Sequence, residues 1–174
     1  MKKSSLDDVD TIPNPMGANT VRKSITGAVG AEDVAITHYE LNPGEAFSAG
    51  LHTHNDQEEL FYVISGTATF QVGQKQAERE AIEVEAGEVI HFAPGEFQTG
   101  RNASDDEVVG LAVSAPGHRH EWAELDAMLD CETCGTETRW TCGKDGAGDW
   151  ENQEIDITVT CQECGAEIAT ADLE

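Results

Sequence analysis

The feature that most constrains the fold is a series of short apolar stretches between residues 21 and 115. Each has the length of a β-strand and is bounded by Gly, Pro, Asn or Asp. These stretches are Val34–Leu41, Leu60–Ile64, Thr67–Val72, Ala81–Val84, Val89–Phe92 and Val108–Val113. Short strands at such regular spacing are typical of an all-β sandwich or barrel. We therefore expect a barrel over residues 21–116, with no helix in it.

The segments on either side of this region have a different character. Residues 1–20 contain charges and prolines but little periodicity, which predicts an extended lead-in. After the barrel, Trp122, Leu125, Met128 and Leu129 recur at intervals of three and four residues, the pattern of one apolar helix face. This pattern predicts a short linker helix over residues 117–130.

The last segment, residues 131–174, contains two similar cysteine units. Cys131-Glu-Thr-Cys134-Gly and Cys161-Gln-Glu-Cys164-Gly are separated by 26 residues, and a strand-like run, Ile155–Thr160, precedes the second unit. Two CxxCG turns can present four thiolates tetrahedrally, and a structural metal would supply the folding free energy that so small a segment lacks. The spacing therefore predicts a four-cysteine metal knuckle.

The paired units resemble a zinc ribbon and, more distantly, a rubredoxin, in which the same thiolates hold iron. Zinc is favoured because the prolines that rubredoxins usually place inside the second pair are absent. Cys142, the fifth cysteine, is interpreted as a spare thiol or a neighbour of the site, with replacement of a pair member as the alternative.

A second candidate metal site lies inside the predicted barrel. His52 and His54 are two residues apart, and on a strand this spacing points both imidazoles to the same face. Glu59 follows at an odd offset, but turn-forming residues 55–57 lie between and can bring it back to that face. Two imidazoles and a carboxylate are suitable ligands for a first-row divalent ion.

These residues resemble the first motif of the cupin family, a class of jelly-roll barrels. Pro43-Gly44-Glu45 is followed by His52-Thr-His54, Glu59 and Gly66, although the gap from Gly44 to His52 is longer than usual. A second cupin motif follows in order. Its matching residues are Gly87, Pro94, Gly95, Gln98 and Asn102. The resemblance covers roughly residues 21–115 and implies a metal held by His52, His54 and Glu59.

One departure from the family pattern affects the expected ligands. The second cupin motif normally ends in a histidine that is the fourth metal ligand, whereas this chain has Gln98 there. An amide oxygen is a weaker donor than imidazole, so Gln98 is expected to be a weak fourth ligand. By resemblance the barrel metal is Fe, Mn, Ni, Co, Cu or Zn, and a metal-free ligand pocket is the alternative.

The other histidines are given smaller roles. His91 lies in a strand-like run before the second-motif proline, and it is a candidate for the pocket wall or, equally, a strand residue without a chemical role. His118 and His120 form a second HxH in a hydrophilic linker, and we expect both at the surface.

The charge of the chain limits its partners. The 34 acidic and 10 basic residues give a net charge of −24, which is spread over the whole chain and resembles the composition of halophilic proteins. No basic stripe is available for nucleic acid, and no apolar run is long enough for a membrane span. We expect a cytoplasmic protein with reduced thiols, and the cupin resemblance implies a homodimer.

Two functions fit these features. The first is a metal-dependent, oxygenase-type enzyme that acts on an unknown small molecule and carries a structural zinc knuckle. The second is a non-catalytic module that binds a small ligand or metal and whose zinc ribbon docks to a protein partner. No general acid or base is identified by the sequence, so neither function is preferred.

Overall fold

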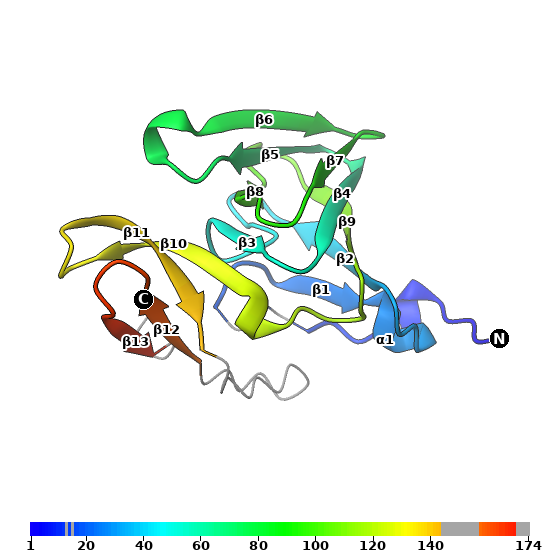
Figure 1. The fold of residues 1–174 in the computed structure, drawn as a ribbon. Helices are drawn as coiled ribbons and strands as arrows, with labels where there is room; N and C mark the ends of the chain where they lie inside the picture. The colour runs from blue at the N-terminus through cyan, green and yellow to red at the C-terminus, as the bar shows by residue number, and fades with distance from the viewer. Residues whose placement is uncertain (13, 15, 144–156, 170–174) are drawn as a thin grey trace.

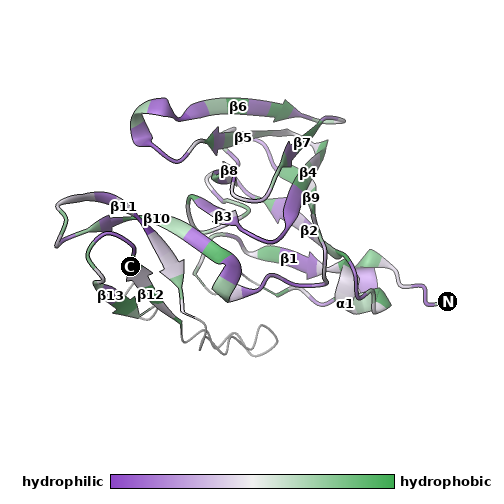
Figure 2. Cartoon of the chain, in the orientation of Figure 1, coloured by the Kyte–Doolittle hydropathy of each residue, from purple (hydrophilic) through white to green (hydrophobic). Residues whose placement is uncertain are grey.

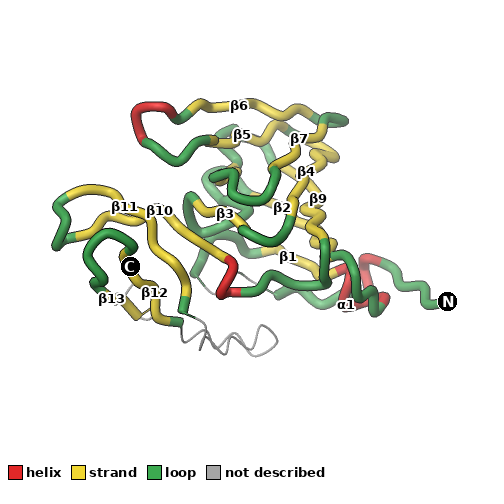
Figure 3. The backbone as a smooth tube through the Cα atoms, viewed as in Figure 1, coloured by secondary structure: helices red, strands yellow, loops and turns green. Residues whose placement is uncertain are grey.

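The computed structural model describes residues 1–12, 14, 16–143 and 157–169, and strands dominate it (Figures 1 and 3). Among these residues the helical elements are short: the α-helix α1 (Ile25–Val29) and the 3-10 helices η1 (Leu6–Asp8), η2 (Gln76–Glu78) and η3 (Trp122–Glu124). The expectation of no helix in the barrel region is therefore wrong, because α1 forms about one and a half turns there. Ser24 caps this helix by accepting a hydrogen bond from the Gly27 amide. None of the described helices is long and apolar enough to cross a membrane.

The described strands form two antiparallel sheets. One has the order β1-β2-β9-β4-β7 and the other β13-β12-β11-β10-β3-β8-β5-β6. In the first sheet the strands are β1 (Val21–Ser24), β2 (Ala35–Leu41), β9 (Val108–Ala115), β4 (Glu58–Ser65) and β7 (Val89–Phe92). In the second they are β3 (His52–His54), β5 (Thr67–Val72), β6 (Glu80–Glu85), β8 (Gln98–Arg101), β10 (Leu125–Cys131), β11 (Thr136–Cys142), β12 (Thr158–Cys161) and β13 (Glu167–Ala169).

The strand pattern read from the sequence is confirmed in the barrel. All six predicted stretches overlap strands β2, β4, β5, β6, β7 and β9. Hydrophilic and hydrophobic residues mix along strands such as β6, as a strand with one solvent-facing side requires (Figure 2). Gly66 joins β4 to β5 with a positive φ of 79°, and a Cβ there would lie 2.6 Å from the Glu107 carbonyl oxygen. Only glycine fits this turn.

The barrel core lies between the two sheets and is rich in aromatic rings. Phe47 packs at its centre against Tyr39, Phe61 and Phe70, with ring centroids 5.1 to 5.7 Å apart. The core also contains the buried residues Leu41, Val63, Ala68, Val84, Phe92, Val108 and Ala112. This apolar layer fixes the sheets on which the polar site residues stand.

The linker helix predicted for residues 117–130 is wrong. Residues 125–131 form strand β10, which pairs with β3 on one side and with β11 on the other. Leu125, Leu129 and Cys131 alternate on one face and pack with the C-terminal apolar cluster. The period of three to four depended on Trp122, which precedes the strand in η3 although it packs with the same cluster, and on Met128, which lies on the other face of β10. The backbone pairing with two neighbours therefore decided the structure.

Strand β10 therefore makes the cysteine segment a continuation of the barrel sheet (Figure 1). A second apolar cluster, with Trp140, Ile157 and Val159 buried, lies in this extension. The run Ile155–Thr160 is confirmed as a strand from Thr158, where β12 begins; Ile157 lies outside the strand, and residues 155 and 156 lie outside the described residues.

Candidate metal centres

The first candidate centre is built from β3 and the start of β4. His52 and His54 lie on β3, and the turn at residues 55–57 reverses the chain so that Glu59 on β4 faces them. One potential ligand atom from each of the three residues lies within 4.8 Å of the others. His54 and Glu59 are each only 6% exposed. The convergence of these three side chains agrees with the sequence-based expectation.

Gln98 reaches the same centre from β8, where it is the register partner of His52. Its amide Nε2 donates a hydrogen bond to Glu59 Oε2 at 2.9 Å and lies 3.3 Å from His52 Nε2. Its oxygen Oε1 is buried without a hydrogen-bond partner among the described residues. In this geometry Gln98 acts as a donor that orients Glu59.

Hydrogen bonds fix the orientation of His52 and Glu59. The Nδ1 atom of His52 lies 2.9 Å from the Gly50 carbonyl, which can only accept, so Nδ1 carries the proton and Nε2 presents a lone pair. Ser114 donates to Glu59 Oε1 at 3.2 Å. Such contacts to the atoms that face away from an ion are typical of metal ligands.

Burial sets the protonation of these groups. It lowers the pKa of His54 to about 2, with His120 and His52 adding to the effect, and it lowers the pKa of His52 despite the Gly50 hydrogen bond. Burial also raises the pKa of Glu59 to about 7, against the hydrogen bonds from Ser114 and Gln98. At neutral pH the imidazoles are therefore neutral, as metal ligation requires.

His120 also belongs to this centre, although the sequence analysis placed it at the surface. Its ring stacks on that of His54, with centroids 4.1 Å apart and 15° between the planes. Its Nε2 lies 4.0 Å from Glu59 Oε1. Burial, followed by His52 and Arg22, lowers the pKa of His120 to about 4. The available signal was its position seven residues after the last predicted strand of the barrel, Val108–Val113.

The remaining histidines lie outside the centre. His91 does not line the pocket as the sequence analysis allowed, because its half-exposed side chain bonds Glu58 at 2.9 Å. His118 is exposed, as expected.

Two hollows adjoin the centre. A small one, of about 10 Å³, lies beside His54, Glu59 and Gln98. A larger cleft, of about 730 Å³, is lined by β1, α1, β2, the N-terminal segment and the loop after β9. Among its lining residues are Asp8, Arg22, Tyr39 and His120. The N-terminal lead-in thus contributes to the cleft, and His120 lies between the cleft and the candidate metal ligands.

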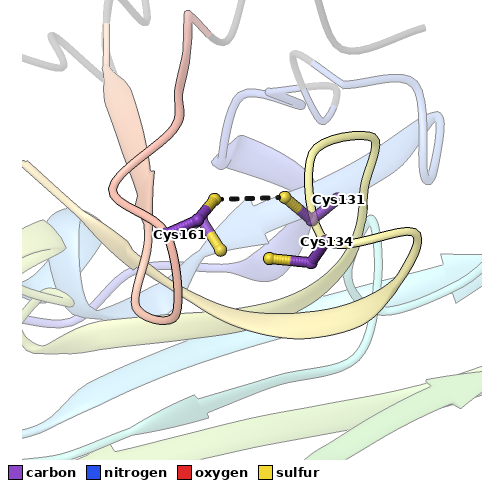
Figure 4. A group of neighbouring side chains, drawn as sticks. Cys131, Cys134 and Cys161 are labelled. Carbon is purple, nitrogen blue, oxygen red and sulfur yellow. Dashed lines mark hydrogen bonds between the residues drawn. The ribbon is translucent and has the colours of Figure 1, made fainter.

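The second candidate centre joins the turns after β10 and β12. The sulfur atoms of Cys131, Cys134 and Cys161 point toward one another (Figure 4), and all four thiols, including that of Cys164, lie within 4.8 Å of one another. The Cys131 and Cys164 sulfur atoms are 3.6 Å apart, close to the spacing of about 3.8 Å expected for two thiolates on one tetrahedral zinc ion. The donor set fits zinc.

The pKa values of Cys161 and Cys142 are shifted in opposite directions. A hydrogen bond from Thr138 lowers the pKa of Cys161 to about 6, which favours its thiolate. Cys142 is buried in the neighbouring apolar cluster and does not belong to the four-thiol group. Burial, with a smaller effect of Asp126, raises the pKa of Cys142 to about 11, so its thiol stays neutral.

Comparison with known proteins identifies the barrel. The family profile described as "Cupin domain" matches residues 37–114. A cupin protein from Bacteroides fragilis is similar in structure, with 19% identity and a TM-score of 0.52, over 66% of this chain and 83% of its own. Residues 37–114 have the cupin fold.

Other structures similar to this cupin barrel include proteins described as enzymes. One is a putative sugar phosphate isomerase from Acidithiobacillus ferrooxidans, with 19% identity and a TM-score of 0.51, over 88% of this chain and 78% of its own. Another is a recombinant oxalate oxidase in complex with glycolate, with 16% identity and a TM-score of 0.51, over 66% of this chain and 58% of its own. No curated protein matches the sequence. At these identities the likeness concerns the fold.

Proposed function

We propose that this protein is a metal-dependent enzyme of the oxygenase type that acts on a small molecule, and that its cysteine centre holds a structural zinc ion. The observation that carries the proposal is the cluster of the half-buried His52 with the buried His54 and Glu59, which His120 connects to a cleft of about 730 Å³. A volume of this size is in the usual range for small-molecule sites, about 300 to 1,000 Å³.

The donor set determines which ions suit the barrel. Imidazole and carboxylate ligands fit the first-row ions Fe, Mn, Ni, Co, Cu and Zn. When bound, such an ion supplies Lewis acidity and, if it is redox-active, a means of reacting with dioxygen. The surrounding residues orient the side chains that would bind the ion. Gln98 and Ser114 fix the Glu59 carboxylate, while the Gly50 carbonyl fixes the His52 ring. The aromatic core behind them excludes water from the closed side.

Oxygen uptake tests the proposed activity. The protein, loaded in molar KCl with Fe²⁺ or Mn²⁺, is screened against a panel of small organic acids, sugars and phenols. We expect uptake with at least one compound, and its loss in His52→Ala. The matched control, His91→Ala, removes an exposed histidine that lies outside the centre and should retain the activity. Uptake that persists unchanged in His52→Ala would contradict the proposal.

A second candidate function is ligand binding without turnover. It is favoured by the hydrogen bonds of Gln98, whose amide donates into the centre at the position where the family's fourth ligand is expected. In this case the sheet shared by barrel and cysteine segment would relay binding to a protein partner. Saturable binding of a small molecule to a metal-free barrel, without oxygen uptake, would favour this alternative.

A further inference from the structure

We propose that His120, from the loop after the barrel, is the third imidazole ligand of the barrel metal and replaces the histidine that is absent at position 98. The inference rests on the proposed metal dependence and extends it. It assigns a ligand set of three imidazoles and one carboxylate, drawn from His52, His54, His120 and Glu59.

The sheet register explains how the loop reaches the centre. Ser114 on β9 lies opposite Glu59 on β4, and Ala115 lies opposite Glu58. The chain thus leaves the sheet beside the metal-binding carboxylate, and His120 follows five residues after β9 ends. Its side chain is 30% exposed, on the side toward the cleft.

Gln57 holds this loop and sets the tautomer of His120. The buried Gln57 amide nitrogen donates to the carbonyl oxygens of Pro116 and Arg119. Because two carbonyls face that nitrogen, the amide orientation is fixed, and Oε1 points to His120 Nδ1 at 2.8 Å. Oε1 can only accept, so Nδ1 donates and His120 Nε2 is left with a lone pair.

That lone pair lies near the Glu59 carboxylate. His120 Nε2 is 4.0 Å from Glu59 Oε1, and His54 Nε2 is 3.8 Å from Glu59 Oε2. Neighbouring ligand atoms around an ion with bonds of about 2.1 Å lie about 3 Å apart. Binding would therefore bring His120 Nε2 about 1 Å closer to the Glu59 carboxylate and tilt the His120 ring out of its stack with His54. The hydrogen bond at Nδ1 is the support that ligating histidines usually have on their other nitrogen.

Gln98 is the competing fourth ligand, and its contacts argue for a different role. Its amide nitrogen faces Glu59 Oε2 and His52 Nε2. Turning the amide to present Oε1 would place that oxygen against the carboxylate and would remove the donor that holds Glu59. Gln98 is therefore a positioning residue.

Manganese binding tests the assignment. The cysteine centre is first filled with zinc, and Mn²⁺, which soft thiolates do not favour, is then titrated in molar KCl. We expect pulsed EPR to count three coordinated imidazoles in the natural chain. His120→Asn keeps a side-chain amide that can donate to Gln57 but lacks Nε2, so it should lower the imidazole count to two and weaken Mn²⁺ binding at least about tenfold.

Two control variants sharpen the result. His91→Asn should leave both measurements unchanged, and Gln98→Leu should retain three imidazoles. Two imidazoles in the natural chain, with unchanged binding in His120→Asn, would overturn the assignment of His120 while leaving the proposed metal dependence intact. A natural chain that binds no Mn²⁺, Fe²⁺ or other first-row ion at the barrel would overturn both. The imidazole count in the natural chain does not depend on any variant folding.

Discussion

Thr53 on β3 lies directly opposite Asp126 on β10 in an antiparallel register. Thr53 stands between the two histidines of the barrel centre, and β10 ends at Cys131 of the cysteine centre. One pair of strands therefore carries candidate ligands of both metal centres. The cysteine segment is part of the barrel sheet and not a separate appendage.

The junction between the two parts depends on Asp126. This carboxylate is 3% exposed and accepts hydrogen bonds from Thr141, Arg139 and Asn55. We expect Asp126→Asn to lower the free energy of unfolding by about 2 kcal/mol, because Arg139 loses its charged partner. Urea unfolding in molar KCl measures this. Asp130→Asn, an exposed change on the same strand, should alter stability by less than about 0.5 kcal/mol. Equal effects of the two substitutions would mean that the hydrogen bonds of Asp126 do not stabilise the junction.

Protonation of Asp126 should lower the stability of the protein in acid. Burial opposes ionisation of Asp126, but the hydrogen bonds from Thr141, Asn55 and Arg139 outweigh it and hold the pKa below the usual 3.8. The stabilisation is thus present above about pH 4 and lost as the pH falls through the folded-state pKa. In Asp126→Asn this component of the acid transition should be missing.

Metal binding at the barrel should depend on pH through Glu59. Burial raises the pKa of this carboxyl to about 7, and an ion must displace its proton. The affinity for Mn²⁺ should fall about tenfold per pH unit below pH 7 and level off above it. In the metal-free protein the sign for folding is opposite to that of Asp126: stability decreases as the pH rises from about 4.5 to 7. A pH-independent affinity between pH 5.5 and 7 would contradict this.

The two classes of cysteine should respond differently to substitution. Cys161→Ser removes one of the four converging thiols and should abolish stoichiometric zinc binding. Cys142→Ala should retain zinc and cost about 1 kcal/mol of stability, because it leaves a small cavity in the apolar cluster. Elemental analysis and urea unfolding distinguish these results. Loss of zinc in Cys142→Ala would instead make that thiol a ligand.

We propose that the homodimer expected from the cupin resemblance forms through the outer face of β4 and β7. Tyr62 and Val89 are register partners there, 40% and 61% exposed, and Ile64 is 45% exposed. Val89→Glu should shift the protein to monomer in sedimentation velocity experiments in molar KCl. Glu85→Gln, an exposed change nearby in the sequence, should retain the dimer. A natural chain that sediments as a monomer would contradict the proposal.

The sequence predicted those parts of the structure that are encoded by residues close together in the chain. Strand-length stretches located β2, β4, β5, β6, β7 and β9, and the CxxC spacing located the four thiols. His52, His54 and Glu59 were found together because a strand period and a turn bring them to one face.

The features that the sequence analysis missed depend on contacts between distant segments. The stretch around Met128 has a helical period, but its backbone pairs with β3 and β11, and such pairing leaves no local trace. His120 lies in a polar loop, and only the β9–β4 register and the Gln57 clamp bring it to Glu59. The role of Gln98 as a donor likewise depends on the position of its amide.

Elemental analysis of the protein purified from molar KCl, with no added metal and no metal-affinity tag, counts the ions held by the two centres. We expect about one zinc ion and about one redox-active first-row ion per chain, with the second ion lost in His52→Ala and the zinc retained. Zinc alone, at about one ion per chain in both proteins, would contradict a metal-dependent barrel.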